Sequence, residues 1–157
     1  MVVGYFAYGS NMNPARMRER GMRFSQALGA RLEGLRLVFD KASKVDFGAD
    51  AAASQQIGHA NVVYDPGGVV EGVVYHLVDA AEILRMDPFE CAPVNYSREV
   101  VQPRGHTSCW IYFANPGVRR SGLRPSRSYL NHLLEARGFL SSDYYQMLQQ
   151  IDAVEDE

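Results

Sequence analysis

The chain has 157 residues, of which 46% are hydrophobic and 22% charged, a composition that is typical of one folded domain and excludes a disordered or fibrous protein. Sixteen basic and eighteen acidic residues give a formal charge of −2, so the overall charge does not favour binding to nucleic acid or to an acidic membrane. We therefore expect neither as a partner and look for chemistry in local groups.

The N-terminal segment has the pattern of a buried strand followed by a short helix. Residues 2–9 form an apolar and aromatic run, which is typical of a strand buried on both faces. Asn13 is a good N-cap and Pro14 suits the first helical position, so we predict a helix over residues 14–20. A tight loop, Tyr8-Gly9-Ser10-Asn11, then joins the strand to the helix.

The central part of the chain is predicted to contain strands around one long loop. Residues 27–32 and 35–39 suit two short strands, and the small and polar residues 41–58 suit a surface loop. The β-branched runs 60–64 and 69–78 are joined by Asp-Pro-Gly-Gly, which has the turn chemistry of a hairpin. Asp79 and Glu82 resemble a capping box for a helix over residues 80–86.

The C-terminal part is predicted as a strand pair and two helices. Residues 95–102 and 108–113 alternate in polarity across a turn, and residues 126–137 and 142–151 have helical patterns. The sum is an α+β protein with six or seven strands. We predict a single domain over residues 1–151 and an acidic tail over residues 152–157.

Cysteine content and the N-terminal sequence bear on metals and on the compartment. Cys91 and Cys109 are too few for a disulfide scaffold and have no zinc-ligand spacing, so we expect no metal site. The chain shows no apolar run of membrane-spanning length and no basic opening of a secretory signal. We therefore predict a cytoplasmic protein without a membrane partner.

The loop at residues 8–11 is the first candidate for chemistry. Gly9 would let the backbone approach a ligand closely, and N–H groups at the helix start could bind a carboxylate or a polarised carbonyl oxygen. The alternative is a tight turn without a ligand. The loop fits neither phosphate-binding glycine motif nor the nucleophile elbow of serine hydrolases, so those enzyme classes lose support.

Glu90 is the second candidate, because its neighbours in sequence are apolar. Partial desolvation would raise the pKa of its carboxyl group and suit it to proton transfer near neutrality, whereas in the alternative it simply points to solvent. Asp87 fits a structural cap or turn better, and Cys91 fits a buried thiol better than a nucleophile. Two arginine clusters, at residues 16–23 and 119–127, fit solvated faces, with an anionic-ligand or partner patch as the alternative.

Residues 5–12, Tyr-Phe-Ala-Tyr-Gly-Ser-Asn-Met, resemble the N-terminal signature of the γ-glutamylcyclotransferases. Further matches follow in the same order along most of the chain. They are Ala30-Arg31-Leu32, Glu71-Gly72-Val73-Val74-Tyr75, Asp87-Pro88-Phe89-Glu90 ahead of Tyr96, and Pro125-Ser126-Arg127-Ser128-Tyr129. One departure is Cys91, which stands where the family usually has glycine.

The resemblance implies a small mixed β-barrel of about six strands flanked by helices. It also implies a reaction without a cofactor, in which a γ-glutamyl compound releases an amino acid or amine and becomes 5-oxoproline. Glu90 would be the general acid and base. The implied substrate-binding residues are Tyr5, Phe6, Ala7, Tyr8, Gly9, Ser10, Asn11, Tyr96 and Tyr129.

Three alternatives stay open at this point. The substrate could instead be a γ-glutamylamine or the γ-glutamyl group of a secondary metabolite, since one fold can serve several substrates. The domain could also bind a small molecule without catalysis. The oligomeric state is open as well, with a homodimer as one option.

Overall fold

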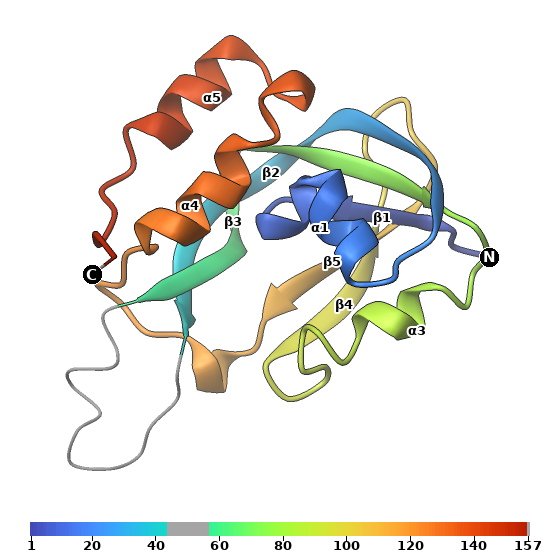
Figure 1. Ribbon diagram of the computed structural model, residues 1–157, viewed down its shortest axis with the longest axis horizontal. Helices are drawn as coiled ribbons and strands as arrows, with labels where there is room; N and C mark the ends of the chain where they lie inside the picture. The colour runs from blue at the N-terminus through green and yellow to red at the C-terminus, as the bar shows by residue number, and fades with distance from the viewer. Residues whose placement is uncertain (44–56, 157) are drawn as a thin grey trace.

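The computed structural model describes residues 1–43 and 57–156, whose strands form one sheet in the order β2-β3-β1-β5-β4 (Figure 1). The α+β class is confirmed, although the sheet is curled rather than closed, so the word barrel describes it loosely. Among the described pairs of strands in this sheet, only β1–β5 is parallel. The strands are β1 (Gly4–Ala7), β2 (Phe24–Ala42), β3 (Gly58–Leu77), β4 (Tyr96–Val101) and β5 (Cys109–Ala114).

The sheet has five strands rather than about six because two predicted pairs of short strands are each one long strand. The predicted hairpin is wrong: residues 60–64 and 69–77 lie in the same strand, β3, and both pair with β2. The Asp-Pro-Gly-Gly segment forms a bulge, since Glu33 pairs with Val69 whereas Leu35 pairs with Tyr64. Opposite this bulge Gly34 has a φ of +86°, which glycine adopts without strain.

The helices are short, and α1, α4 and α5 each begin at a side-chain cap. Asn13 accepts a hydrogen bond from Ala15 N at 3.0 Å, and Ser126 and Ser141 cap the two C-terminal helices in the same way. Their bounds are α1 (Pro14–Glu19), α3 (Ile83–Met86), α4 (Arg127–Leu134) and α5 (Ser142–Gln149), with 3-10 helices η1 (Ser10–Met12), η2 (Pro116–Val118) and η3 (Arg137–Phe139). No helix of residues 1–43 and 57–156 is long and apolar enough to cross a membrane.

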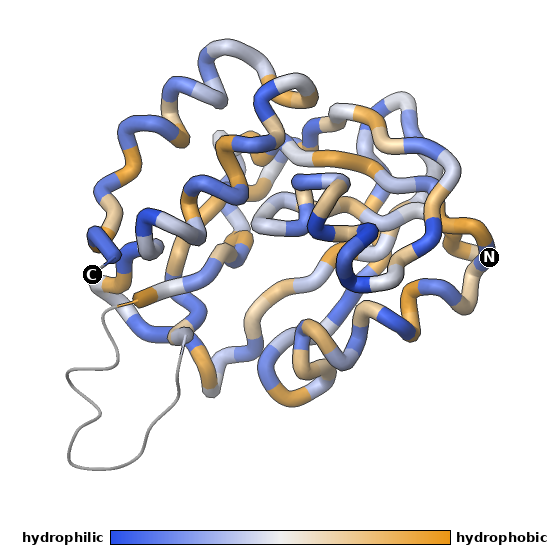
Figure 2. The backbone as a smooth tube through the Cα atoms, viewed as in Figure 1, coloured by the Kyte–Doolittle hydropathy of each residue, from blue (hydrophilic) through white to orange (hydrophobic). Residues whose placement is uncertain are grey.

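The core lies between the sheet and the layer formed by η1, α1 and α4. Phe6 and Tyr75 from the sheet are fully buried, as are Met12, Met17 and Leu130 from the helical layer. Figure 2 shows the hydrophilic and hydrophobic residues of α4 and α5 alternating along each helix, as expected for helices that pack with one face. The packing of η1 against α4 holds the end of β1 in place.

Two other predicted segments need comment. Asp79 accepts a hydrogen bond from Ala81 N, but Glu82 does not complete a capping box, because its buried carboxylate binds the backbone N–H and the guanidinium of Arg23. Most of the predicted loop at residues 41–58 lies outside the described residues. The acidic C-terminal residues contact the start of α4, where Arg127 pairs with Glu155 at 2.9 Å.

Candidate active site

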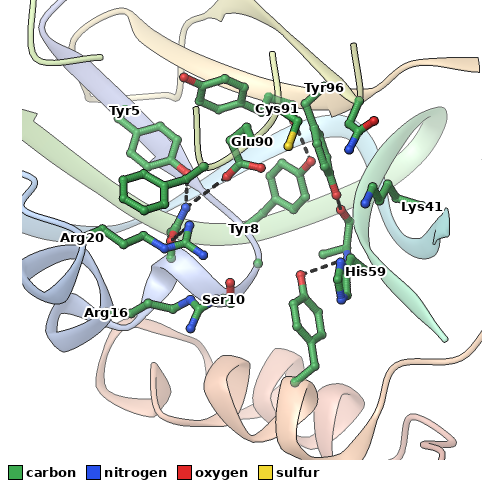
Figure 3. Close-up of a pocket in the computed structure, with 17 residues that line it drawn as sticks. Tyr5, Tyr8, Ser10, Arg16, Arg20, Lys41, His59, Glu90, Cys91 and Tyr96 are labelled. Carbon is green, nitrogen blue, oxygen red and sulfur yellow. Dashed lines mark hydrogen bonds between the residues drawn. The ribbon is translucent and has the colours of Figure 1, made fainter. Parts of the chain in front are cut away.

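A cavity of about 230 Å³ opens where β1 runs into η1 (Figure 3). The structure brings most of the predicted substrate-site residues to it, from segments far apart in the sequence. Those that line it are Tyr5, Tyr8, Gly9, Ser10, Asn11, Glu90, Tyr96 and Tyr129. Phe6 and Ala7 do not line the cavity: both are buried in the core, and Phe6 alternates with Tyr5 along the strand.

The loop after β1 passes close to α4 and β3. A Cβ atom on Gly9 would lie 3.1 Å from Ala60 Cβ and 3.2 Å from the hydroxyl of Tyr129, which leaves little room for a side chain. The loop is closed by a hydrogen bond from Met12 N to Gly9 O at 3.0 Å, and the hydroxyl of Tyr75 donates to Asn11 O at 2.7 Å. The backbone of the loop is therefore held at the cavity wall.

Glu90 reaches the same wall from the segment that follows α3. Its Oε1 accepts a hydrogen bond from the side-chain amide of Asn11 at 3.2 Å, and this amide also donates to the hydroxyl of Tyr5 at 3.0 Å. Arg20 donates to Asn11 Oδ1 at 3.0 Å. Because a guanidinium can only donate, Arg20 orients the amide so that its NH₂ group faces Glu90.

The charge of Glu90 is set by opposing effects. Burial raises the pKa of its carboxyl group, while the cations Arg20, Lys41 and Arg16 and the hydrogen bond from Asn11 lower it. Burial prevails, so the pKa lies above its ordinary value. This environment matches the partial desolvation that the sequence predicts.

The segment that carries Glu90 is anchored by Asp87. Arg98 of β4 binds the carboxylate of Asp87 through two hydrogen bonds, at 2.9 and 3.1 Å, and the hydroxyl of Tyr112 of β5 donates to it as well. The pKa of Asp87 is lowered because these hydrogen bonds and the charge of Arg98 outweigh its burial. Asp87 therefore has a structural role, as predicted: it ends α3 at the turn that follows, and its side chain also anchors the segment to β4 and β5.

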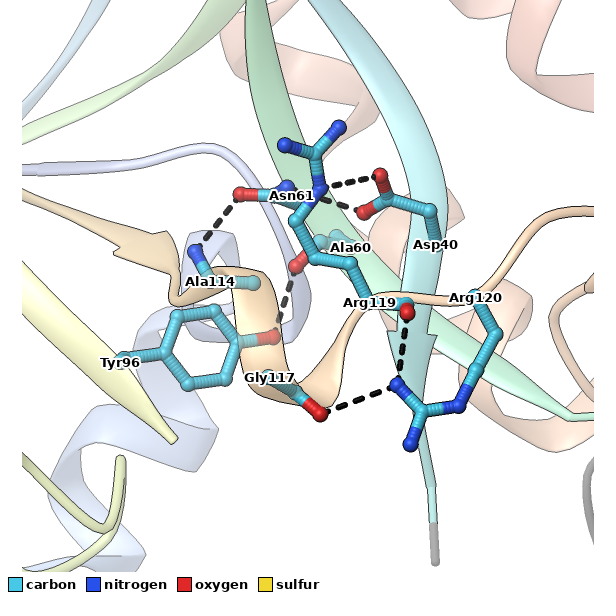
Figure 4. A network of polar contacts seen from close by, with 8 residues as sticks. All are labelled: Asp40, Ala60, Asn61, Tyr96, Ala114, Gly117, Arg119 and Arg120. Atoms are coloured by element: carbon cyan, nitrogen blue, oxygen red, sulfur yellow. Dashed lines mark hydrogen bonds and ion pairs between the residues drawn. The ribbon is translucent and has the colours of Figure 1, made fainter. Parts of the chain in front are cut away.

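The opposite wall is fixed by contacts to Ala60 of β3. The hydroxyl of Tyr96 donates to Ala60 O at 2.8 Å, and Ala60 N donates to the hydroxyl of Tyr129 at 3.0 Å. The next residue, Asn61, is 1% exposed and joins three elements: it donates to Asp40 at 2.9 Å and accepts from Ala114 N at 2.8 Å (Figure 4). These contacts explain how two tyrosines from distant segments meet at one cavity.

Of the nine lining residues that were not predicted, four have basic side chains: Arg16, Arg20, Lys41 and His59. The two arginines belong to the first arginine cluster, for which an anionic-ligand patch was the alternative. Lys41 falls within the predicted surface loop, yet it is the penultimate residue of β2 and is only 7% exposed. His59 stacks on the ring of Tyr129, with centroids 4.6 Å apart, and burial together with Lys41 and Arg16 lowers its pKa to about 4.

Cys91 also lines the cavity, and its thiol is exposed, so the prediction of a buried thiol is wrong. Its φ of +48° lies in the left-handed region, where glycine is favoured.

No group of three or more metal-ligating side chains occurs in the part of the chain that the structure describes. The cavity thus contains one carboxylate with a raised pKa, several tyrosine hydroxyls and nearby cations. These groups are suited to proton transfer and to binding an anionic ligand.

The sequence matches a family model described as gamma-glutamyl cyclotransferase, AIG2-like, over residues 5–131. No curated protein matches significantly. Among solved structures, one described as a gamma-glutamyl cyclotransferase is 23% identical and covers 96% of this chain and 88% of its own, with a TM-score of 0.75. An uncharacterized Homo sapiens protein is 24% identical, with coverages of 99% and 90% and a TM-score of 0.79.

A third solved structure is described as a yeast gamma-glutamyl cyclotransferase specific to glutathione. It is 13% identical and covers 93% of this chain and 93% of its own, with a TM-score of 0.61. At these identities the solved structures support the fold.

Proposed function

This chain belongs to the gamma-glutamyl cyclotransferase, AIG2-like family, and we propose that it cyclises the γ-glutamyl group of a small molecule, releasing 5-oxoproline and a free amino acid or amine. The observation that carries this proposal is the placement of Glu90 against Asn11 in the cavity beside the loop at residues 8–11. The family supports cyclotransferase chemistry in general. The roles of individual residues are our proposal.

The reaction needs no external nucleophile. The α-amino nitrogen of the glutamyl group attacks its own γ-carbonyl carbon, the new C–N bond closes a five-membered lactam, and the C–N bond to the leaving amine breaks. One proton moves from the attacking nitrogen to the leaving nitrogen, so the atoms balance without water or an oxidant. Because well-oriented intramolecular reactions reach effective molarities of about 10⁵–10⁸ M, folding the substrate is a large part of the task.

Glu90 is the group we propose to move this proton. An α-ammonium group is unreactive, so the substrate reacts as the free amine after losing one proton to solvent. Glu90 then accepts the proton that the attacking nitrogen loses as the lactam forms and delivers it to the leaving nitrogen. The raised pKa of Glu90 suits both steps, because the ideal pKa for proton transfer lies near the operating pH. Asn11 holds one oxygen of this carboxylate in place.

The backbone N–H groups of residues 9–11 are proposed to hold the substrate and to stabilise negative charge that develops on an oxygen, as oxyanion-hole donors do. Tyr129 is proposed as a substrate contact beside this loop. Support comes from the short distance between the Tyr129 hydroxyl and the Gly9 position.

The test of this function is 5-oxoproline release from γ-glutamyl dipeptides by the wild type and by Glu90→Gln. We expect the variant to lose about 10²- to 10⁴-fold in kcat, the usual contribution of general acid and base catalysis. Glu99→Gln, an exposed change on β4, is the matched control and should leave turnover unaltered. Equal turnover by wild type and Glu90→Gln would remove Glu90 from the mechanism, and no turnover of any γ-glutamyl compound by the wild type would refute the proposed activity.

A second candidate is a binding domain without catalysis, which Cys91 favours, because a non-glycine residue with φ of +48° directly follows Glu90. Calorimetry with 5-oxoproline and a γ-glutamyl dipeptide separates the two functions. Tight binding without any product would support the binding domain.

A further inference from the structure

The cations of the cavity lie on two sides of Glu90. Arg16 and Arg20 reach it from α1 and the residue that ends α1, whereas Lys41 reaches it from the end of β2 (Figure 3). In Figure 3, Glu90 and Tyr8 lie between Lys41 and the two arginines. Glu90 is the one carboxylate among the described lining residues, so these residues give the cavity a positive balance.

Arg20 and Lys41 differ in what they already contact. Arg20 donates to Asn11, and its guanidinium lies 4.9 Å from the ring centroid of Phe89, so it is built into the wall that supports Glu90. Lys41 is 7% exposed, and burial lowers the pKa of its amino group although Glu90 lies near enough to oppose the shift. A buried ammonium is costly in free energy unless an anionic group faces it.

A γ-glutamyl amino acid has a matching distribution of charge. It has one carboxylate on the glutamyl part and one on the leaving amino acid, and the bond that breaks lies between them. Glu90 must act at that bond if it transfers the proton, so the two carboxylates would extend to opposite sides of Glu90. A γ-glutamyl derivative of a neutral amine has no second carboxylate to place there.

We propose that Lys41 binds the carboxylate of the leaving group and thereby selects γ-glutamyl derivatives of amino acids over those of neutral amines. This inference rests on the proposed function. It makes Lys41 the residue that determines leaving-group specificity, while Glu90 and Asn11 serve every γ-glutamyl substrate alike.

The experiment compares γ-glutamyl-alanine with γ-glutamyl-alaninamide, which has nearly the same shape but a neutral carboxamide in place of the carboxylate. We expect the wild type to prefer the acid by about 10- to 100-fold in kcat/KM, as a hydrogen bond between charged groups warrants. Lys41→Met should lose most of this preference by slowing the acid more than the amide, because the loss of its charge also raises the pKa of Glu90 for both substrates, and Lys41→Arg should keep most of it. Arg31→Met removes one exposed positive charge from the same strand and should keep the wild-type ratio.

The outcomes are separable. A wild type that turns over both compounds without a preference, or a Lys41→Met variant that slows both by the same factor, would overturn the role of Lys41 while leaving the proposed function intact. A wild type that releases 5-oxoproline from neither compound would refute the proposed function and this inference with it. If thermal unfolding shows that Lys41→Met does not fold, the wild-type ratio and the Lys41→Arg ratio still decide the question.

Discussion

The orientation of Glu90 depends on a residue that touches it only through another side chain. Asn11 could present either its oxygen or its nitrogen to the carboxylate, and only the nitrogen can donate a hydrogen bond. Arg20 decides between them, because it donates to Asn11 Oδ1 and so turns the NH₂ group toward Glu90. Arg20 is therefore a positioning residue that also lowers the pKa of Glu90 through its charge.

Replacing Arg20 should change how activity depends on pH. In Arg20→Met the pKa of Glu90 rises further, because the variant lacks one of the positive charges that lower this pKa against the effect of burial. A base is active when deprotonated, so activity is lost as pH falls through its pKa, and the acidic limb of the kcat/KM profile should move to higher pH. At neutral pH we expect a loss of roughly 10- to 100-fold, since a misplaced catalytic group costs about that much.

The measurement is a pH series of 5-oxoproline release, with Arg18→Met as the control. Arg18 is an exposed residue on the same helix, outside the cavity lining, and its loss removes the same charge. Arg20→Lys keeps the charge without the fork of donors, so it should retain the wild-type acidic limb better than Arg20→Met. An unchanged acidic limb in Arg20→Met would contradict the effect of Arg20 on the pKa of Glu90, and unchanged turnover at neutral pH would contradict its positioning role.

Sequence reasoning identified Glu90 and the loop at residues 8–11 but not the cations around them. Glu90 stood out because its apolar neighbours are adjacent in the chain. The positions of Arg16, Arg20 and Lys41 depend on how α1 and β2 are placed in the folded molecule. The local sequence pattern around each residue does not predict that placement. An arginine cluster looks the same in sequence whether it faces solvent or a cavity.

The backbone conformation of Cys91 should cost free energy of folding that can be measured. For a residue with a Cβ atom, the left-handed conformation costs roughly 1–2 kcal/mol, and its φ is +48°. Cys91→Gly should therefore raise the free energy of unfolding by about 1 kcal/mol, whereas Cys91→Val should lower it, because β-branched residues tolerate this conformation least. Chemical denaturation measures both, and a stabilising Cys91→Val would show that the backbone is not strained at this residue.

At the scale of the elements, the main error of prediction was the hairpin. The Asp-Pro-Gly-Gly segment does interrupt the regular pairing of the strands, as its turn residues indicate. A turn sequence alone, however, cannot distinguish a chain reversal from a bulge in a continuous strand. A Cβ atom on Gly68 would lie 2.6 Å from Leu35 O, so the bulge itself needs a glycine there. The glycine that favours a hairpin in the sequence therefore allows two strands to approach closely in the structure.

The segment that carries Glu90 should depend on its anchor to β4 and β5. Asp87→Asn removes the ion pair with Arg98, in which both side chains are 23% exposed. The change should lower the free energy of unfolding by about 1–3 kcal/mol. It should also lower kcat, because Glu90 is three residues away on the same segment. Urea unfolding and 5-oxoproline release measure the two effects.

The matched control for this pair is Asp152→Asn. Asp152 pairs with Arg124 at the surface, with side chains 78% and 45% exposed, and surface ion pairs contribute roughly 0–1 kcal/mol. If Asp87→Asn unfolded at the same urea concentration as the control and kept full activity, the anchor would have no role in stability or catalysis.

For the whole molecule, stability should fall on acidification between about pH 6.5 and 4, mainly through His59. Its pKa is lowered from 6.5 to about 4 in the folded state, so the unfolded chain takes up a proton first as the pH falls. The contribution of neutral His59 is complete above pH 6.5 and is lost as the pH approaches 4, at most about 3 kcal/mol. His132, whose pKa is also lowered by burial, adds in the same direction.

Other groups act in different windows or with the opposite sign. The lowered pKa of Asp87 and of Glu82 removes stability only at more acidic pH, below their ordinary values near 4. The raised pKa of Glu90 works against the trend, because its protonation relieves the cost of a buried charge as the pH falls.

His59→Phe keeps a ring against Tyr129 but cannot titrate, so its midpoint of thermal unfolding should drop less than that of the wild type between pH 7 and 5. His106→Phe, in the turn between β4 and β5, should behave as the wild type, and equal drops in all three proteins would show that His59 does not govern the acid sensitivity.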